Sequence, residues 1–481
     1  MDDFVRASSS GPTLLRLCGK DGPASEATCK AQPYDALAGR MEEALKAALA
    51  KAPATTRPLL KRDQAWFNEM LANIAQLMPP DNPDATLIAL IKQRTETLAG
   101  LAPGFGRSGV AGRWLDAFGS VTVTPAANGA YSVSIDTQSD YRAGEETVWE
   151  CHLTTELTPG DNGWWKGMIP AVPEPAHLNK DGIAVPAQKQ SVLKMRRQGE
   201  TLRVVVDSSG DDALHACRRT YQITGSYFAS GAPEASAAAD KTDTSFVAPS
   251  FDCVRPASAS DEEICADPEL ADNDLRLNRT WKALQPRLDD ATRRALAEDQ
   301  RHWVQTQVWQ YPEHLHPAWD KRTYFMHDTV DGRNDLKILQ RERIALLEGF
   351  DENRNGFAGL WLGYTAILKV DMNGDVLKAD GWKWTQGLWK EACDFEMSGR
   401  VSGGLFRSRN DRVNPDTLER DHATLIVNGR DDAFAEKRFS DDGKRLGDEP
   451  KCQRSGSLSS TTRLFPVRPS PDIEAAQHTF R

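Results

Sequence analysis

Two clusters in this 481-residue chain have residue types and spacings that could hold a metal ion. His314-x-His316 lies near His327, and imidazole is the commonest metal ligand in proteins. Asp351-Glu-Asn353-Arg-Asn355-Gly356 begins like a calcium loop, but its twelfth position is Leu362, where calcium loops need a bidentate Glu. We interpret the histidines as surface residues and reject a calcium site at Asp351, and we predict no metal and no cofactor.

The sequence contains no P-loop, GxSxG, HExxH or GxGxxG motif, and no pair of carboxylates stands out as the acid and base of a glycosidase. Asp63-Gln64 and Asp299-Gln300 could suggest catalysis, but we predict that they make polar contacts between helices. Trp164-Trp165 and the group Trp382, Trp384 and Trp389 could face a sugar or a partner; we favour core or barrel-rim packing. The chain is predicted not to be an enzyme.

Charge and hydropathy limit the possible partners. The formal net charge is −10, with a pI near 5.5, which disfavours nucleic acid and an anionic membrane surface. No apolar run approaches the ~20 residues of a transmembrane helix. An acidic protein is suited to a basic partner, because opposite charges speed association.

The same landmarks occur twice along the chain and in the same order. Cys29 and Asp63-Gln64 recur 236 positions later as Cys265 and Asp299-Gln300. Further matches with drifting offsets are Arg94 and Arg343, Gly109-x2-Gly-x-Trp114 and Gly356-x2-Gly-x-Trp361, Asn128-Gly129 and Asn373-Gly374, Cys151 and Cys393, and Cys217 and Cys452. A repeat of this kind indicates a duplicated module of roughly 220 residues.

Periodicity indicates what each module contains. Apolar residues at spacings of three and four predict helices near 33–51, 55–77 and 84–98, and again near 268–288, 291–309 and 333–347. Asp267 is predicted to cap a helix that begins at Pro268. Period-two segments around the two Asn-Gly pairs predict hairpins, and with further short strands they favour a small antiparallel barrel or sandwich.

The predicted fold class is therefore α+β, a tandem duplication of a three-helix domain followed by a β-rich domain. The expected ranges are 14–101 (helical) and 105–228 (β-rich) for the first copy, 229–249 for a flexible linker, 250–350 (helical) and 355–468 (β-rich) for the second copy, and 469–481 for a tail.

Eight cysteines fall four to each copy, which suggests disulfides and an oxidising compartment. Within a copy, we choose the pairings that cross no domain boundary: Cys18–Cys29 with Cys151–Cys217, and Cys253–Cys265 with Cys393–Cys452. Free buried thiols remain an alternative; spacings of ten and eleven residues do not suit a compact zinc site. We expect a periplasmic or secreted protein, although Met1-Asp-Asp-Phe-Val-Arg is no signal peptide and we expect the native one to have been removed.

Part of the second copy resembles the LprI-type lysozyme-inhibitor family of secreted bacterial proteins. The resemblance covers about 100 residues and rests on residues in a fixed order, namely Ser250-Phe-Asp-Cys253, Ile264-Cys-Ala-Asp-Pro-Glu-Leu270, Asp274, Leu277, Asp299-Gln300, Trp303 and Arg343-Ile344. Cys18, Cys29, Gln64 and Arg94 of the first copy match through the repeat. The resemblance implies an envelope protein that binds and blocks a cell-wall hydrolase, and it supplies no catalytic residue.

The functional hypothesis is a periplasmic protein that neutralises a peptidoglycan-degrading enzyme, as a lysozyme inhibitor or as an immunity protein against a toxin. It would act by placing a loop of a rigid module in the cleft of the enzyme. The residues that contact the partner are not predicted. The alternative is a non-catalytic structural or scaffolding protein of the envelope.

Overall fold

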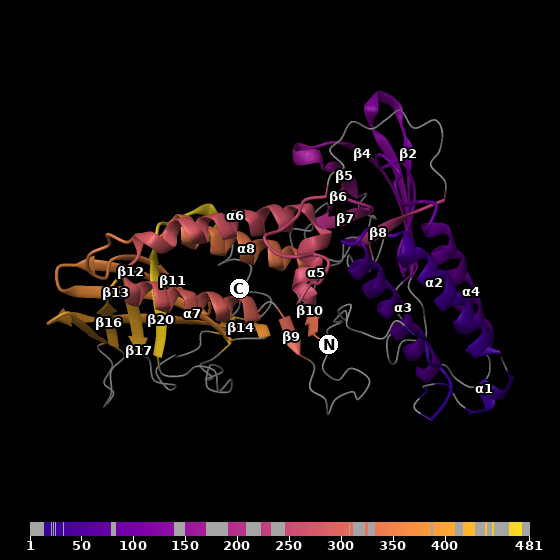
Figure 1. The fold of residues 1–481 in the computed structure, drawn as a ribbon. Coiled ribbons are helices and arrows are strands. Elements are labelled where there is room, and N and C mark those ends of the chain that lie inside the picture. Colours follow the sequence, from indigo (N-terminus) through magenta and orange to yellow (C-terminus); the bar gives the residue numbers. More distant parts are fainter. Residues whose placement is uncertain are drawn as a thin grey trace, which may run out of the picture. The chain divides into compact units, whose positions relative to one another are not determined.

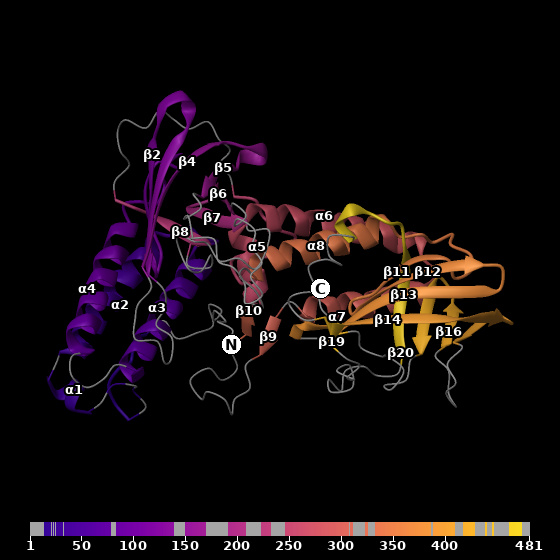
Figure 2. The same cartoon turned by 180° about the vertical axis from the view of Figure 1, so that it is seen from behind.

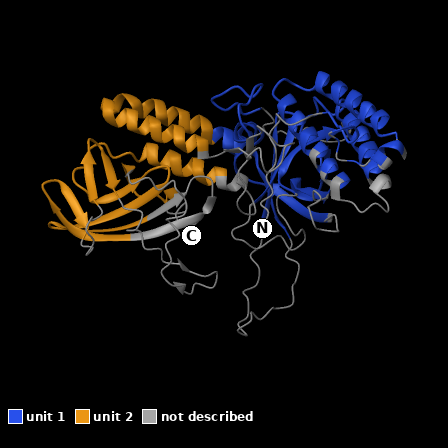
Figure 3. Cartoon of the chain, turned by 90° about the horizontal axis from the view of Figure 1, so that it is seen from below, with its two compact units in different colours: residues 1–272, 310–332 blue, residues 273–309, 333–481 orange. Residues whose placement is uncertain are grey.

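A computed structural model of the chain describes residues 14–20, 22, 24, 26–31, 33–77, 83–138, 150–169, 191–207, 223–231, 246–306, 308–310, 323–325, 332–385, 388–408, 417–428, 438–439, 445–446 and 461–473. The chain divides into two compact units (Figure 3), residues 1–272 with 310–332 and residues 273–309 with 333–481. Each unit combines helices with a closed antiparallel barrel, in agreement with the predicted α+β class.

The helices described in the first unit are α1 (Glu26–Ala31), α2 (Tyr34–Lys51), α3 (Arg57–Leu77), α4 (Pro83–Leu101) and α5 (Ala259–Ala266). Three of them, α2, α3 and α4, agree with the predicted ranges. α2, α3 and α4 lie side by side in both views (Figures 1 and 2), and the apolar residues of α2 at spacings of three and four are buried from Tyr34 to Leu45. The short α1 and α5 were not predicted, because each occupies a segment that we interpreted as an irregular cysteine-closed loop.

The first barrel is a meander in which each strand pairs with the next and β8 closes on β1. Its strands are β1 (Gly112–Leu115), β2 (Gly119–Pro125), β3 (Tyr131–Gln138), β4 (Glu150–Pro159), β5 (Trp165–Ile169), β6 (Ser191–Gln198), β7 (Thr201–Asp207) and β8 (Gly225–Ser230). The predicted hairpin turn lies between β2 and β3, where Asn128 and Gly129 have φ of 58° and 74°. Such left-handed angles favour Asn and Gly, which accounts for the sequence signal.

The second unit has the same plan. Its helices are α6 (Pro268–Leu284), which begins in the first unit, α7 (Asp290–Thr306) and α8 (Gly332–Glu348). Its barrel consists of β11 (Gly359–Leu362), β12 (Ala366–Asn373), β13 (Val376–Thr385), β14 (Leu388–Ser402), β15 (Leu405–Ser408), β16 (Thr417–Asp421), β17 (Thr424–Asn428) and β20 (Thr461–Val467). Outside the two barrels, two further strand pairs of the chain were not predicted. One is β9 (Val308–Gln310) with β10 (Thr323–Phe325), of which β10 belongs to the first unit, and the other is β18 (Arg438–Phe439) with β19 (Arg445–Leu446).

The two barrels share a buried anchor. Trp114 and Trp361 are completely buried, and the indole Nε1 of each donates a hydrogen bond of 2.7 Å to a carbonyl four residues earlier, Val110 O or Phe357 O. An arginine guanidinium stacks over each indole, at 5.7 Å for Arg107 and 5.3 Å for Arg354. The glycine-tryptophan landmarks of the sequence thus mark equivalent positions in the two barrels.

The ends of the predicted linker and tail are packed. β8 extends through Ser230, inside the range 229–249, and Val247 N donates to Gln198 Oε1 of the first barrel at 3.0 Å. Residues 232–245 lie outside the described residues. In the range 469–481, Ile473 is completely buried in the core of the second unit. The small, polar composition of 229–249 and the terminal position of 469–481 carried no signal for these contacts.

Candidate functional site

The repeated Asp-Gln pair joins two helices to a barrel in the first unit. Arg94 of α4 donates to Asp63 Oδ2 at 2.6 Å and to Gln64 Oε1 at 3.0 Å, both on α3. The other oxygen of Asp63 accepts a hydrogen bond of 2.8 Å from the backbone N–H of Ala117, in the turn between β1 and β2. All three side chains are buried, and Arg94 also stacks over Phe67 at 5.3 Å.

The second unit repeats this arrangement. Arg343 of α8 donates to Asp299 Oδ2 at 2.6 Å and to Gln300 Oε1 at 2.5 Å, and it lies 5.8 Å from the ring of Trp303. Asp299 Oδ1 accepts from the backbone N–H of Tyr364 at 3.0 Å. The prediction of polar contacts between helices is confirmed. The aromatic residue three positions after the Gln supplies a surface for the arginine.

Two of the four predicted disulfides are confirmed. Cys18–Cys29 and Cys253–Cys265 are bonded, with Cα–Cα distances of 5.7 and 5.8 Å. Cys151 is buried in the first barrel and is also disulfide-bonded. Cys217, Cys452 and the side chain of Cys393 lie outside the described residues, so their pairings stay predictions. The two barrel cysteines occupy matching places in their sheets. In the first barrel Cys151 pairs with Thr137, which pairs in turn with Gly119. In the second barrel Cys393 pairs with Lys383, which pairs in turn with Ala366.

The segment closed by Cys253–Cys265 packs on the first unit through buried charges. Arg62 of α3 donates to Glu263 Oε1 of α5 at 2.8 Å. Arg203 of β7 lies 3.3 Å from Glu263 Oε2 and 3.3 Å from Asp267 Oδ2. All four side chains are almost completely buried. Buried charges are costly unless paired, so these contacts fix α5 on the barrel and on α3.

Asp267 has a second role that the sequence predicted. Its Oδ1 accepts hydrogen bonds from the backbone N–H groups of Glu269 at 2.8 Å and Leu270 at 3.3 Å, and α6 begins at Pro268. The predicted N-cap is confirmed. The contact of its other oxygen with Arg203 was not predicted.

The remaining candidates do not form a site in the described part of the chain. Trp164 and Trp165 are buried, and Trp165 packs edge-on against Tyr131 inside the barrel, so core packing is confirmed for this pair. Asp351 pairs with Arg354 at 3.2 Å. His314, His316, His327 and the side chains of Trp382, Trp384 and Trp389 lie outside the described residues. Among the described residues, no group of three His, Cys, Asp or Glu side chains could hold a metal.

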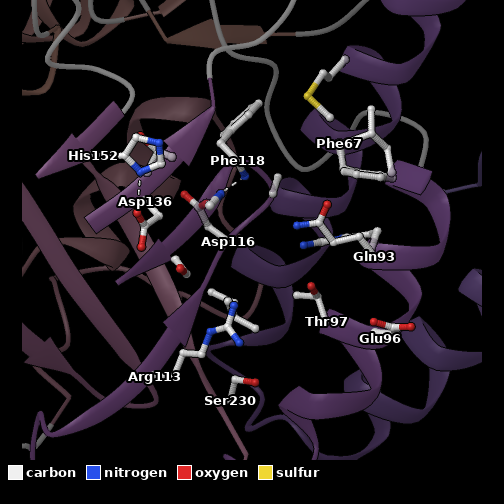
Figure 4. A pocket seen from close by; sticks show the side chains of 18 residues that line it. Phe67, Gln93, Glu96, Thr97, Arg113, Asp116, Phe118, Asp136, His152 and Ser230 are labelled. Atoms are coloured by element: carbon white, nitrogen blue, oxygen red, sulfur yellow. Dashed lines mark hydrogen bonds and ion pairs between the residues drawn. The ribbon is translucent and has the colours of Figure 1, made fainter. Parts of the chain in front are cut away.

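A cavity of about 430 Å³ opens in the first unit between α4 and the first barrel (Figure 4). Gln93, Glu96 and Thr97 line it from the helix, facing residues of the strands that include Arg113 and Ser230. On its far side Asp136 Oδ1 and His152 Nδ1 are 2.7 Å apart. Apolar surface comes from Phe67, Met70, Leu90, Leu115 and Phe118. Sequence reasoning missed this site, since its residues come from separate strands and helices and form no motif.

The order of α5, α6 and α7, with the disulfide before α6 and the Asp-Gln pair on α7, allows a comparison with known proteins. Residues 253–308 match the family model described as Lysozyme inhibitor LprI. This LprI-matching segment includes Cys253, Cys265, Asp267 and Asp299. Comparison with curated proteins and with solved structures gives no match. Within the described residues, no helix is both long and apolar enough to cross a bilayer.

Proposed function

We propose that this chain is an envelope protein that binds a peptidoglycan-degrading, lysozyme-like enzyme and inhibits it. The observation that carries the proposal is the match of residues 253–308 to a lysozyme-inhibitor family. Two disulfides support an oxidising location such as the periplasm. A net charge of −10 supports a cationic partner, because opposite charges accelerate association. The inhibitor would act on a host-type lysozyme or, as an immunity protein, on a bacterial toxin.

We assign occlusion of the enzyme's cleft to a projecting hairpin of the second barrel. The turn between β12 and β13 is exposed, and it carries Asp371 and Asp375 beside Asn373-Gly374. It is tied to the neighbouring hairpin by its backbone, since Val401 N donates to Asp375 O at 2.8 Å, and Asp375 Oδ2 also lies 2.7 Å from Arg400 Nη1 in an exposed ion pair. A rigid loop loses little conformational entropy on binding, which favours affinity.

The first barrel offers a less suitable tip at the equivalent place. The turn between β2 and β3, residues 124–130, carries no charged side chain. The charge difference favours the second module as the inhibitory one. The first module then serves as a rigid support for α5, at the start of the LprI-matching segment. A complex of ordinary size would bury about 1,200–2,000 Å².

The test measures lysis of purified cell walls by a panel of muramidases with and without the full chain. The expected result is inhibition of at least one cationic muramidase. Inhibition should reach its maximum at one chain per enzyme molecule, or at one chain per two enzyme molecules. A matched sample with reduced and alkylated cysteines controls for non-specific effects of an acidic protein, and it should lose inhibition. Undiminished lysis by every muramidase contradicts the proposal and favours a structural role in the envelope.

A further inference from the structure

The cavity of the first unit lies where the second unit has a solid core. The equivalence of the positions follows from shared contacts. Arg113 and Leu360 each precede the buried barrel tryptophan, and they pair across the barrel seam with Ser230 and Val467. Ser120 and Ile367 pair with the residue after that tryptophan, Leu115 or Leu362.

The helices are aligned by equally specific contacts. Arg94 and Arg343 make the same ion pair. Six residues after each arginine, Gly100 O accepts from Gly231 N at 2.9 Å and Gly349 O accepts from Arg468 N at 3.0 Å. Thr97 therefore corresponds to Leu346, because each lies three residues after the arginine.

The lining has opposite character in the two units. In the second unit, these positions belong to one apolar core, in which Leu346 and Val467 are completely buried and Leu360 and Ile367 nearly so. In the first unit the same positions are Thr97, Ser230, Arg113 and Ser120, and a cavity lies between them. Packed interiors leave few voids, so a shared scaffold that exchanges core residues for hydrogen-bonding ones is typical of a binding site.

The charges of the lining indicate the kind of ligand. Glu96, Asp116 and Asp136 would repel an anion, while Arg113 would repel a cation. The lining thus carries hydrogen-bond donors as well as acceptors, and Phe67 and Phe118 add apolar surface. A ligand that fits this lining is uncharged overall and carries both hydrogen-bond donors and acceptors.

We propose that this cavity binds a short neutral saccharide, with an N-acetylated disaccharide as its best representative. Ring hydroxyls and acetamido groups both donate and accept hydrogen bonds, as the mixed lining requires. The volume lies within the usual range of small-molecule sites, roughly 300–1,000 Å³. The inference does not depend on the proposed inhibition of a hydrolase.

The test titrates the full chain with N,N′-diacetylchitobiose in a calorimeter. The expected result is saturable binding of one molecule per chain, because the second unit has filled the equivalent space with leucine, isoleucine and valine. The triple variant Thr97→Leu, Arg113→Leu, Ser230→Val installs the second unit's own residues and should abolish the binding heat. Glu96→Gln, at the exposed rim, should weaken binding about tenfold through one charged hydrogen bond.

Thr124→Leu is the matched control, since it adds an apolar side chain at an exposed position of β2 away from the lining. It should bind like the parent chain. Circular dichroism of the triple variant establishes that it is folded. Absence of saturable binding by the parent chain overturns the proposal, and so does unchanged binding by a folded triple variant. Either result leaves the lysis assay unaffected.

Discussion

Arg94 Nη2 lies 2.6 Å from Asp63 Oδ2, and both side chains are almost entirely buried between helix and barrel. Replacing Arg94 by Met would leave the carboxylate of Asp63 buried without its counter-charge. We expect a loss of about 3–5 kcal/mol of unfolding free energy for the first unit. The measurement is hydrogen exchange by mass spectrometry during urea unfolding, followed on peptides of β2 and β3. Unchanged protection there would contradict a structural role for the pair.

Two variants serve as controls for that experiment. Arg343→Met should cause a loss of the same size but in the second unit, because it breaks the equivalent pair with Asp299. Arg276→Ala removes an ion pair with Glu348 whose side chains are 52% and 40% exposed. Exposed pairs contribute little, so the change should be less than about 1 kcal/mol.

Glu342 makes the stability of the second unit depend on pH. Burial, with a smaller contribution from the charge of Asp299, raises the pKa of Glu342 from 4.5 to about 7. Its Oε2 has no hydrogen-bond partner among the described residues. The folded protein therefore holds this proton more tightly than the unfolded chain does. The contribution of protonated Glu342 to the free energy of unfolding is fully present below about pH 4.5 and is lost as the pH rises through about 7.

The expected loss across that window is on the order of 3 kcal/mol, at 1.36 kcal/mol per pKa unit. Glu342→Gln keeps the size of the side chain and removes the proton equilibrium. The variant should therefore show a flatter dependence of urea midpoint on pH between 5 and 8, and higher stability than the parent at pH 8. An identical slope in parent and variant would assign the dependence to other groups.

The Cys253–Cys265 bond is predicted to stabilise the first unit, although it lies in the LprI-matching segment. It closes the segment that holds Glu263 against Arg62 and Arg203. The double variant Cys253→Ser, Cys265→Ser should lose roughly 3 kcal/mol, from the chain entropy of a short loop. Hydrogen exchange of the β6 and β7 peptides should rise with it. If only peptides of the second unit exchange faster, the assignment of α5 to the first unit is contradicted.

Glu263→Gln gives an independent check, because it leaves the disulfide intact and removes the charge shared by the two arginines. Faster exchange in β7 is expected here too. Cys18→Ser, Cys29→Ser is the matched control: it opens a loop of similar length in the same unit but far along the chain from α5, and the ion pairs of Glu263 should survive it.

The sequence predicted those parts of the fold that are set by local patterns. Asp267 before Pro268 marks a helix start, and the left-handed backbone angles at Asn128 and Gly374 favour the residues found there. The repeat added the equivalence of Trp114 and Trp361. The residues that form each of these patterns lie within a few positions of one another, or the pattern occurs twice in the chain. A single sequence was therefore enough to recognise them.

The contacts of α5 and the cavity could not be predicted in this way. Arg203 is completely buried by partners more than fifty positions away, and nothing near it in the sequence distinguishes it from a surface arginine on a strand. Arg113 and Ser230 become neighbours only when the barrel closes. Closed β-structures bring together residues that are distant in sequence, and their side-chain chemistry follows no short-range spacing.

The acidic turn between β12 and β13 yields the sharpest test of the inhibitory mechanism. Asp371→Lys with Asp375→Lys reverses two charges at an exposed position. We expect slower association with a cationic muramidase, by about tenfold at low salt, and a smaller dependence of the rate on ionic strength. Asp161→Lys, at the exposed turn between β4 and β5, changes the net charge in the same direction and is the matched control. If both variants slow association with the muramidase equally per unit of charge, the net charge of the chain determines the rate and the turn between β12 and β13 is not the contact. If neither variant slows association, the electrostatic part of the proposal fails.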